Sequence, residues 1–275
     1  MERRRLAGEH VRDPMIASLI SDLIQEHCAR DPARTPVIGV AGAQGSGKTY
    51  ICRQLAAANP RIAHFALDDV YFTHAERQRL ARQFHPLFAT RGPPGTHAVG
   101  LALTTIAELR NASAETETPL PRFDKARDDR APTETWPRFK GRPEAILFDG
   151  WCLGALPDEV GDAPINKLET EEDRDGSWRA RIRNDLATRY QMFFAGFDSL
   201  IYLKPPGWGV VRRWRAQQEQ ETLSRELTPD DHARLDRFLM HYERLTRSMM
   251  SGAHCADVVA ALDEGRRVTA IEPAR

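Results

Sequence analysis

The segment from Gly42 to Thr49 reads Gly-Ala-Gln-Gly-Ser-Gly-Lys-Thr and matches the pattern Gly-x-x-x-x-Gly-Lys-[Ser/Thr] at every fixed position. It follows the apolar run Val37–Ala41, and an apolar pattern at helical spacing begins behind it at Ile51. Glycines in such a strand-to-helix turn let backbone N–H groups converge on phosphate oxygens, and the dipole of the following helix adds to the attraction. The segment therefore predicts a phosphate-binding loop.

Such a loop binds the phosphates of a nucleoside triphosphate. We expect Lys48 to reach the β and γ phosphates and to take part in catalysis, and the Thr49 hydroxyl to bind Mg²⁺. The nucleotide-binding residues predicted by the motif are Gly42, Ala43, Gln44, Gly45, Ser46, Gly47, Lys48 and Thr49.

Short, continuously apolar runs indicate strands that are buried on both faces, as in parallel sheets. Besides Val37–Ala41, we expect strands over Ile62–Leu67, Ala145–Phe148 and Ser199–Leu203, with Val258–Leu262 and Arg267–Ile271 closing the sheet edge. The segments between them are long enough for crossover helices. The predicted fold is an α/β, P-loop NTPase (kinase-like) three-layer sandwich with a mainly parallel sheet and lid and loop insertions.

We interpret residues 1–275 as one domain. Asp13-Pro14 is typical of a helix N-cap followed by proline, which predicts an N-terminal helix over 14–30. Within the domain we expect a substrate-loop insertion over 70–143, irregular from 112 onward, and a lid region over 205–235. The strongly acidic stretch 157–178 is interpreted as a surface insertion.

Composition excludes several classes of protein. Lys+Arg and Asp+Glu both number 39, which argues against a nucleic-acid-binding protein, and no run of 18 apolar residues offers a membrane span. The four cysteines are scattered, and the basic N-terminus lacks an apolar stretch behind it, so we expect a reduced, cytoplasmic protein. The oligomeric state stays open.

Three classes of phosphate-loop protein remain: small-molecule kinase, GTPase and motor or assembly ATPase. A GTPase needs Asn-Lys-x-Asp after a strand, whereas Asn166-Lys167-Leu168-Glu169 follows Asp162-Ala163-Pro164 and ends in Glu. Motor ATPases usually carry Asp-Glu after an apolar run, but here Asp149 is followed by Gly150. These departures favour a kinase.

Acidic residues follow two of the predicted strands. Asp68 and Asp69 end the second, and Asp149 ends the third, at the sheet edge where ligands bind in open α/β sheets. A kinase that acts on a hydroxyl needs one carboxylate to accept the proton and another to hold Mg²⁺. We assign Asp68 to catalysis and Asp149 to the metal; a helix N-cap role is the alternative for each, and a direct role for Asp69 stays open.

Six motifs occur in one order along the chain: the phosphate-binding loop, Asp68–Tyr71, Arg91–His97, Pro121–Lys125, Phe148–Gly154 and Arg213–Gln217. Together they resemble the D-glycerate 3-kinase family, which belongs with uridine kinase, phosphoribulokinase and pantothenate kinase. The resemblance spans residues 37–250. It implies phosphorylation of D-glycerate to 3-phosphoglycerate, with ATP and Mg²⁺ as cofactors.

The resemblance also implies roles for individual residues. Asp68 stands where the related kinases keep their catalytic base, and Arg212 and Arg215 fall in the lid over the ATP phosphates. The chain departs from the family in the acidic stretch around 169–177, and Asp149 stands where relatives often have Glu.

Glycerate is a small anion, so its site needs cations that can bind a carboxylate. The predicted substrate-binding residues are Asp68, Tyr71, Arg91, His97, Arg122, Asp124 and Lys125, with Arg130 nearby on the same loop. Two rival interpretations stay open: a kinase for a nucleoside, pantothenate or another hydroxylated metabolite, and a nucleotide-binding protein with little turnover.

Overall fold

The computed structural model describes residues 14–157 and 162–274. Asp13, the predicted N-cap, lies outside the described residues, as do the basic N-terminus and residues 158–161 of the acidic stretch. The predicted N-terminal helix is confirmed as α1, Pro14–Arg30.

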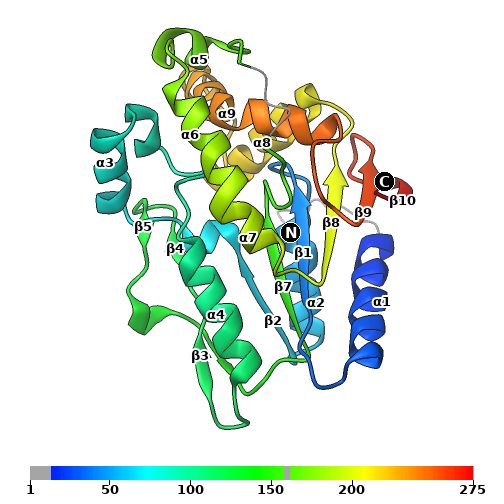
Figure 1. The fold of residues 1–275 in the computed structure, drawn as a ribbon. Helices are drawn as coiled ribbons and strands as arrows, with labels where there is room; N and C mark the ends of the chain where they lie inside the picture. Colours follow the sequence, from blue (N-terminus) through cyan, green and yellow to red (C-terminus); the bar gives the residue numbers. More distant parts are fainter. Residues whose placement is uncertain (1–13, 158–161, 275) are drawn as a thin grey trace, which may run out of the picture.

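A six-stranded sheet forms the centre of the molecule, in the order β10-β9-β8-β1-β7-β2 (Figure 1). All six predicted strands form, and five of them run parallel while β10 returns antiparallel to β9 at the edge. The strands are Val37–Gly42 (β1), Ile62–Ala66 (β2), Ala145–Gly150 (β7), Ser199–Lys204 (β8), Val258–Leu262 (β9) and Val268–Pro273 (β10). The mainly parallel α/β fold is thus confirmed.

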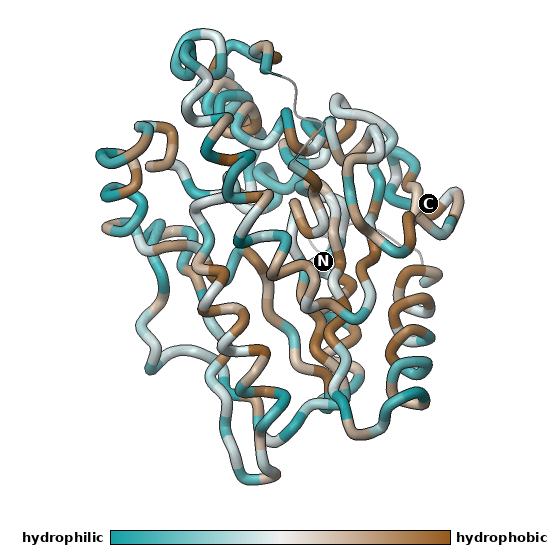
Figure 2. Tube along the Cα trace, in the orientation of Figure 1, coloured by the Kyte–Doolittle hydropathy of each residue, from teal (hydrophilic) through white to brown (hydrophobic). Residues whose placement is uncertain are grey.

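Alternate residues of each central strand enter two separate apolar cores. Val37 and Phe148 belong to one core, which the helices of residues 99–111, 191–194 and 229–250 cover. Ile38 and Leu147 belong to the other core, which α1 and the helices of residues 48–58 and 208–223 cover. Strands buried on both faces need apolar residues at every position, which explains why these runs are continuous rather than alternating. Figure 2 shows the same arrangement, with the central strands and one side of α1 hydrophobic. The layers are therefore helix, sheet, helix.

Helices connect the strands and cover both faces of the sheet (Figure 1). They are Lys48–Ala58 (α2), His74–Gln83 (α3), Val99–Asn111 (α4), Lys167–Glu172 (α5), Ser177–Asp185 (α6), Gln191–Phe194 (α7), Trp208–Leu223 (α8) and Pro229–Met250 (α9). No helix among the described residues is long and apolar enough to cross a membrane.

The stretch predicted to be an irregular loop contains two small antiparallel hairpins. Glu117–Pro119 (β3) pairs with Arg138–Lys140 (β6), and Phe123–Asp124 (β4) pairs with Asp129–Arg130 (β5). Residues 112–143 were expected to be irregular because they lack apolar periodicity; strands this short are held by their pairing and not by an apolar face.

The acidic stretch 157–178 is not simply a surface insertion, which corrects the sequence-based interpretation. Glu169 and Asp173 are both fully buried. Arg244 of α9 donates to the Glu169 carboxylate, and Arg179 of α6 donates to Asp173 Oδ2 over 2.7 Å. Paired carboxylates can be buried where unpaired ones cannot, so acidic composition alone gave the wrong location.

Candidate active site

The phosphate-binding loop joins β1 to α2 at the carboxyl edge of the sheet. Gly45 (φ 78°) and Gly47 (φ 94°) adopt left-handed backbone conformations that favour glycine. A Cβ on Gly45 would lie 2.6 Å from Cβ of Trp214, so α8 packs directly on the loop. Among the described residues, the Gln44 amide and the Ser46 hydroxyl are buried without a hydrogen-bond partner. Unpartnered polar atoms in such a loop fit a phosphate ligand.

Lys48 lies at the first position of α2, as the motif requires. Its ammonium donates to the carbonyl oxygen of Ala43 over 3.4 Å, which is a long and weak hydrogen bond. Burial lowers the pKa of Lys48, while the nearby carboxylates of Asp149 and Asp68 oppose the shift. A cation held this loosely in a dry loop is available to a phosphate.

Thr49 and Asp149, the two predicted metal ligands, are in direct contact. The Thr49 hydroxyl donates to Asp149 Oδ2 over 2.5 Å, although 100 residues separate them in sequence. Asp149 is 1% exposed, and its other oxygen accepts a hydrogen bond from His64 Nε2 at 2.8 Å. A hydroxyl and a carboxylate beside the phosphate-binding loop are the oxygen donors that Mg²⁺ prefers, so the residues present fit this ion.

Asp68 and Asp69 follow β2 in the 3₁₀ turn Leu67–Val70. Asp68 Oδ1 accepts a hydrogen bond from the Tyr71 hydroxyl, and Oδ2 accepts one from Lys125 Nζ, both at 2.6 Å. Desolvation raises the pKa of Asp68, but Lys125 and Tyr71 more than offset it and hold this pKa well below its usual range. Asp68 is therefore an ionised acceptor.

Asp69 has a structural role in this arrangement. Its Oδ2 accepts from the backbone N–H of Ala66 at 3.0 Å and from Arg122 at 2.7 Å. Burial raises its pKa, and Arg122 opposes that shift. Through these contacts Asp69 holds the turn and the Arg122 guanidinium in place.

Several predicted substrate-binding residues form one continuous cluster around Tyr71. The Tyr71 ring stacks on His97 with centroids 4.9 Å apart and meets Phe123 edge-on at 5.2 Å. The Arg91 guanidinium lies over the same Phe123 ring, 5.7 Å from its centroid. The hairpin β4–β5 therefore folds back over the end of β2. It brings Lys125 to Asp68 and Phe123 to Tyr71, and the segment that carries Arg91 and His97 packs against the same two rings.

His97 is a neutral group. It is 1% exposed, and burial lowers its pKa to about 3. Its Nδ1 is 2.5 Å from the Tyr190 hydroxyl, whereas Nε2 is buried without a partner among the described residues. The ring can exchange a hydrogen bond with a ligand but does not supply a positive charge at neutral pH.

Arg91 and Arg215 line a cavity of about 580 Å³ between α3, the β4–β5 hairpin, α8 and α9. Arg91 is paired there with Asp128. The other basic residues in the wall, such as Arg225 and Arg234, are also paired with carboxylates.

Asp124 and Arg130 act mainly within their own hairpin. Asp124 Oδ1 accepts from the backbone N–H groups of Ala126 and Arg127, and Arg130 donates to the carbonyl oxygen of Tyr71. The Asp124 carboxylate holds the turn that presents Lys125, so the described contacts give it an indirect place in the predicted substrate site.

The two predicted lid arginines lie on α8 and face α9. Arg212 pairs with Asp236 at 2.7 Å, and Arg215 pairs with Glu219 at 2.6 Å and lies over the Phe238 ring. In the described part of the chain, neither donates a hydrogen bond to the phosphate-binding loop. At 3.6 residues per turn, Arg212 lies about 160° around the helix from Trp214 and Arg215 about 100°, so Arg215 is nearer to the loop side.

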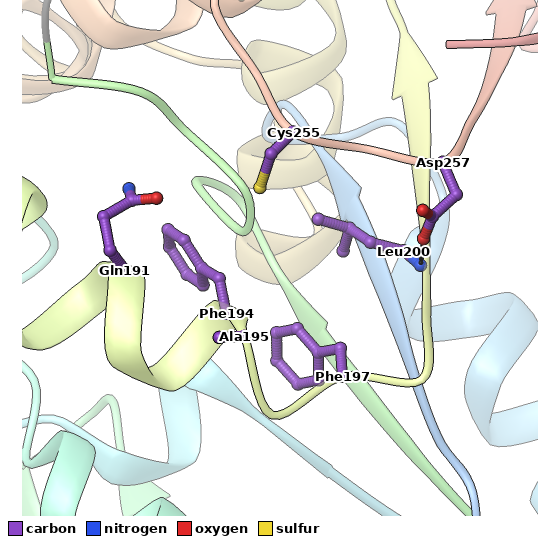
Figure 3. A pocket seen from close by; sticks show the side chains of 7 residues that line it. All are labelled: Gln191, Phe194, Ala195, Phe197, Leu200, Cys255 and Asp257. Carbon is purple, nitrogen blue, oxygen red and sulfur yellow. Dashed lines mark hydrogen bonds between the residues drawn. The ribbon is translucent and has the colours of Figure 1, made fainter.

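A second cavity, of about 250 Å³, contains none of the predicted residues (Figure 3). Phe194, Phe197 and Leu200 line it together with Cys255. Leu200 is the second residue of β8, so this cavity lies toward the amino end of the strands, opposite the phosphate-binding loop.

Sequence reasoning missed His64, Phe123 as a packing platform, and Tyr190. The signal for His64 was a polar residue inside the otherwise apolar strand Ile62–Ala66. Asn166, the first residue of the segment that is similar to a GTPase motif, is the N-cap of α5. Its side chain accepts a hydrogen bond from the backbone N–H of Glu169.

No protein-family model matches the sequence. An uncharacterised kinase of Schizosaccharomyces pombe, mug58, is 29% identical over 273 residues, which cover 90% of this chain and 96% of that protein. The chloroplastic D-glycerate 3-kinase of Arabidopsis thaliana is 32% identical over 197 residues, which cover 66% of this chain and 41% of that protein.

A solved structure of a kinase has the same fold as this chain. The D-glycerate 3-kinase of Cryptococcus neoformans superposes with a TM-score of 0.72 at 20% identity, over 94% of this chain and 99% of that one. A likeness at this identity concerns the fold alone. The chain is therefore similar in sequence to two kinases, one of them a D-glycerate 3-kinase, and it shares the fold of a second D-glycerate 3-kinase over nearly all of its described length.

Proposed function

We propose that this protein transfers the γ-phosphoryl group of ATP to a hydroxyl of D-glycerate, giving 3-phosphoglycerate. The observation that carries the proposal is the position of Asp68, an ionised carboxylate in contact with Tyr71 and Lys125 at the same sheet edge as the phosphate-binding loop. The glycerate kinase among the sequence relatives supports the choice of acceptor.

Asp68 would accept the proton of the attacking hydroxyl. The hydroxyl oxygen forms a bond to the γ-phosphorus while the bond from this phosphorus to the leaving oxygen of ADP breaks. Phosphoryl transfer needs little covalent help from the protein, so a base of low pKa that positions the hydroxyl suffices. Lys48 would balance the charge on the transferred group. Tyr71 and Lys125 hold the Asp68 oxygens in place, and each oxygen keeps a second lone pair that could accept from the acceptor hydroxyl.

The carboxylate of glycerate would bind among the cations of the same cluster. Lys125, Arg91 and Arg122 approach the end of β2 from two segments, and an arginine can bind a carboxylate through two parallel hydrogen bonds. We assign the Tyr190 hydroxyl as the donor to His97 Nδ1, which leaves the ring proton on Nε2. That free N–H would donate to a hydroxyl of the substrate.

Thr49 and Asp149 would hold Mg²⁺ beside the phosphates. When bound, the ion would draw charge from the β and γ phosphate oxygens. The protein's contribution is to keep the Asp149 carboxylate oriented, through the hydrogen bonds from Thr49 and His64.

A coupled assay that measures ADP release tests the proposal on the full chain with D-glycerate, L-glycerate, uridine, cytidine and pantothenate as acceptors. We expect turnover with D-glycerate above all others, and 3-phosphoglycerate as the product by NMR. Lys48→Ala is the matched control and should lose activity while its far-ultraviolet circular dichroism stays unchanged. If a nucleoside or pantothenate were preferred, that compound would replace D-glycerate as the proposed acceptor. Absence of turnover with all five acceptors would refute the proposal.

A further inference from the structure

A thiol, an imidazole and a carboxylate, all groups that can bind a metal ion, lie close together beneath the phosphate-binding loop. Cys52 Sγ, a ring nitrogen of His64 and a carboxylate oxygen of Asp149 all lie within 4.8 Å of one another, and all three residues are buried. Asp149 belongs to the site described above. The proposed phosphoryl transfer makes no use of Cys52.

The fold brings these three residues together from α2, β2 and β7. Asp149 is the register partner of Ala66, and His64 stands two residues before Ala66, so both side chains lie on one face of the sheet. Cys52 lies one turn beyond Lys48 on α2, which packs on that face. The surrounding residues of this core, including Ile38 and Leu147, are apolar.

We propose that Cys52, His64 and Asp149 form a binding site for a thiophilic divalent cation of the Zn²⁺ type, and that its occupation inhibits the kinase by withdrawing Asp149 from Mg²⁺. The site stands on its geometry alone. The inhibitory consequence rests on the proposed function.

The donor set suits zinc better than magnesium. Thiolate, imidazole and carboxylate are all common zinc ligands, whereas Mg²⁺ prefers oxygen. Tetrahedral zinc with normal bond lengths separates its ligand atoms by about 3.5 Å. His64 Nε2 and Asp149 Oδ1, now 2.8 Å apart, would separate slightly to admit the ion, and no pair in the cluster is more than 4.8 Å apart. Water or the Thr49 hydroxyl is available as a fourth ligand beside Asp149.

Charge balance also favours the site, because all three side chains are buried and a dication there needs anionic ligands. On binding, the thiol and Nε2 of His64 each lose a proton. Nδ1 of His64 takes up one of these protons and the other is released to solvent, so the neutral ring coordinates through Nε2. Two negative ligands then neutralise the dication, which a buried site requires.

Inhibition follows because Asp149 cannot serve both ions. Thr49 contacts the Asp149 oxygen that Mg²⁺ would share, and His64 contacts the other. A zinc ion that draws this carboxylate toward Cys52 would pull it away from the nucleotide. Zinc inhibition should therefore weaken as the Mg²⁺ concentration rises.

The first experiment measures binding without turnover. Full-length, nucleotide-free protein is titrated with Co²⁺ as the spectroscopic probe, and we expect a thiolate-to-cobalt charge-transfer band in the near ultraviolet that Zn²⁺ abolishes. Cys52→Ala should lose the band, while Cys255→Ala, which removes an exposed thiol, should keep it. Absence of the band in the unaltered chain, or its persistence in folded Cys52→Ala, would overturn the site.

The second experiment measures inhibition of phosphoryl transfer by Zn²⁺ at several Mg²⁺ concentrations. Cys52→Ala should keep the basal activity and need at least tenfold more Zn²⁺ for half-inhibition than Cys255→Ala. Equal sensitivity of the two variants would refute the inhibitory role. If the protein proves inactive on every acceptor, the cobalt band still decides whether the cation site exists, so the two proposals fail separately.

Discussion

Lys125 Nζ donates to Asp68 Oδ2 over 2.6 Å, joining a hairpin turn to the end of β2 across 57 residues of sequence. Lys125 is the more exposed partner, with 59% of its side chain open to solvent against 39% for Asp68. An exposed cation thus covers one oxygen of the proposed base. The pair neutralises Asp68 in the free enzyme and offers a positive charge to an incoming carboxylate.

We predict that Lys125→Met shifts the acid limb of the kcat/KM profile to higher pH by about one unit or more. Lys125 lowers the pKa of Asp68, so without it Asp68 binds its proton at higher pH and activity is lost earlier on acidification. The pH dependence of kcat/KM, followed from pH 8 down to the lowest pH at which both proteins stay folded, measures the shift. Lys140→Met, which removes another exposed paired lysine, should leave the limb in place.

Asp68→Asn should lower kcat by about 10²–10⁴-fold while the KM for ATP stays within a few fold. The amide keeps the shape and the contacts of the side chain but cannot accept the proton of the attacking hydroxyl. Steady-state kinetics with both substrates varied separates the two parameters. A loss confined to ATP binding would move Asp68 from proton transfer to nucleotide positioning.

The strands and the phosphate-binding loop could be predicted because their signals are local. The run Val37–Ala41 is continuously apolar, and the glycines that the loop needs follow it directly in the sequence. Thr49 and Asp149 were each assigned to the metal from the sequence, and the structure places them in contact because the carboxyl ends of parallel strands meet at one edge.

Contacts that depend on strand register or on distant partners could not be predicted. His64 reaches Asp149 only because β2 and β7 pair in one particular register, which apolar composition does not encode. Glu169 is buried because Arg244, 75 residues later, lies opposite it. The charges of an acidic run need either water or partners of opposite charge. Only the packing of α5 on α9 decides which of the two each carboxylate has.

Arg179→Ala should destabilise the protein by about 3–5 kcal/mol, because it leaves the Asp173 carboxylate buried without its partner. Arg179 and Asp173 are 5% and 0% exposed, and the guanidinium makes two hydrogen bonds to that residue. Urea unfolding followed by circular dichroism measures the free energy. Arg30→Ala, which breaks an exposed pair with Glu26, is the control and should leave the midpoint nearly unchanged.

Arg215→Ala should lower kcat by tenfold or more at saturating ATP and acceptor, and Arg212→Ala by less than threefold. Both arginines were expected in a lid over the phosphates, but α8 turns them through different angles from Trp214, the residue that rests on Gly45. Arg215 is 20% exposed and lines the same cavity as Arg91, whereas the side chain of Arg212 is half exposed and paired with Asp236. A small rotation of α8 would bring Arg215 toward the phosphates, where its charge stabilises the transferred group, and would leave Arg212 on the far side. Steady-state kinetics of both variants, with thermal melts to verify folding, makes the comparison. Equal losses in the two would show that α8 closes as a whole over the nucleotide, and unchanged kinetics in both would leave α8 as packing for the loop.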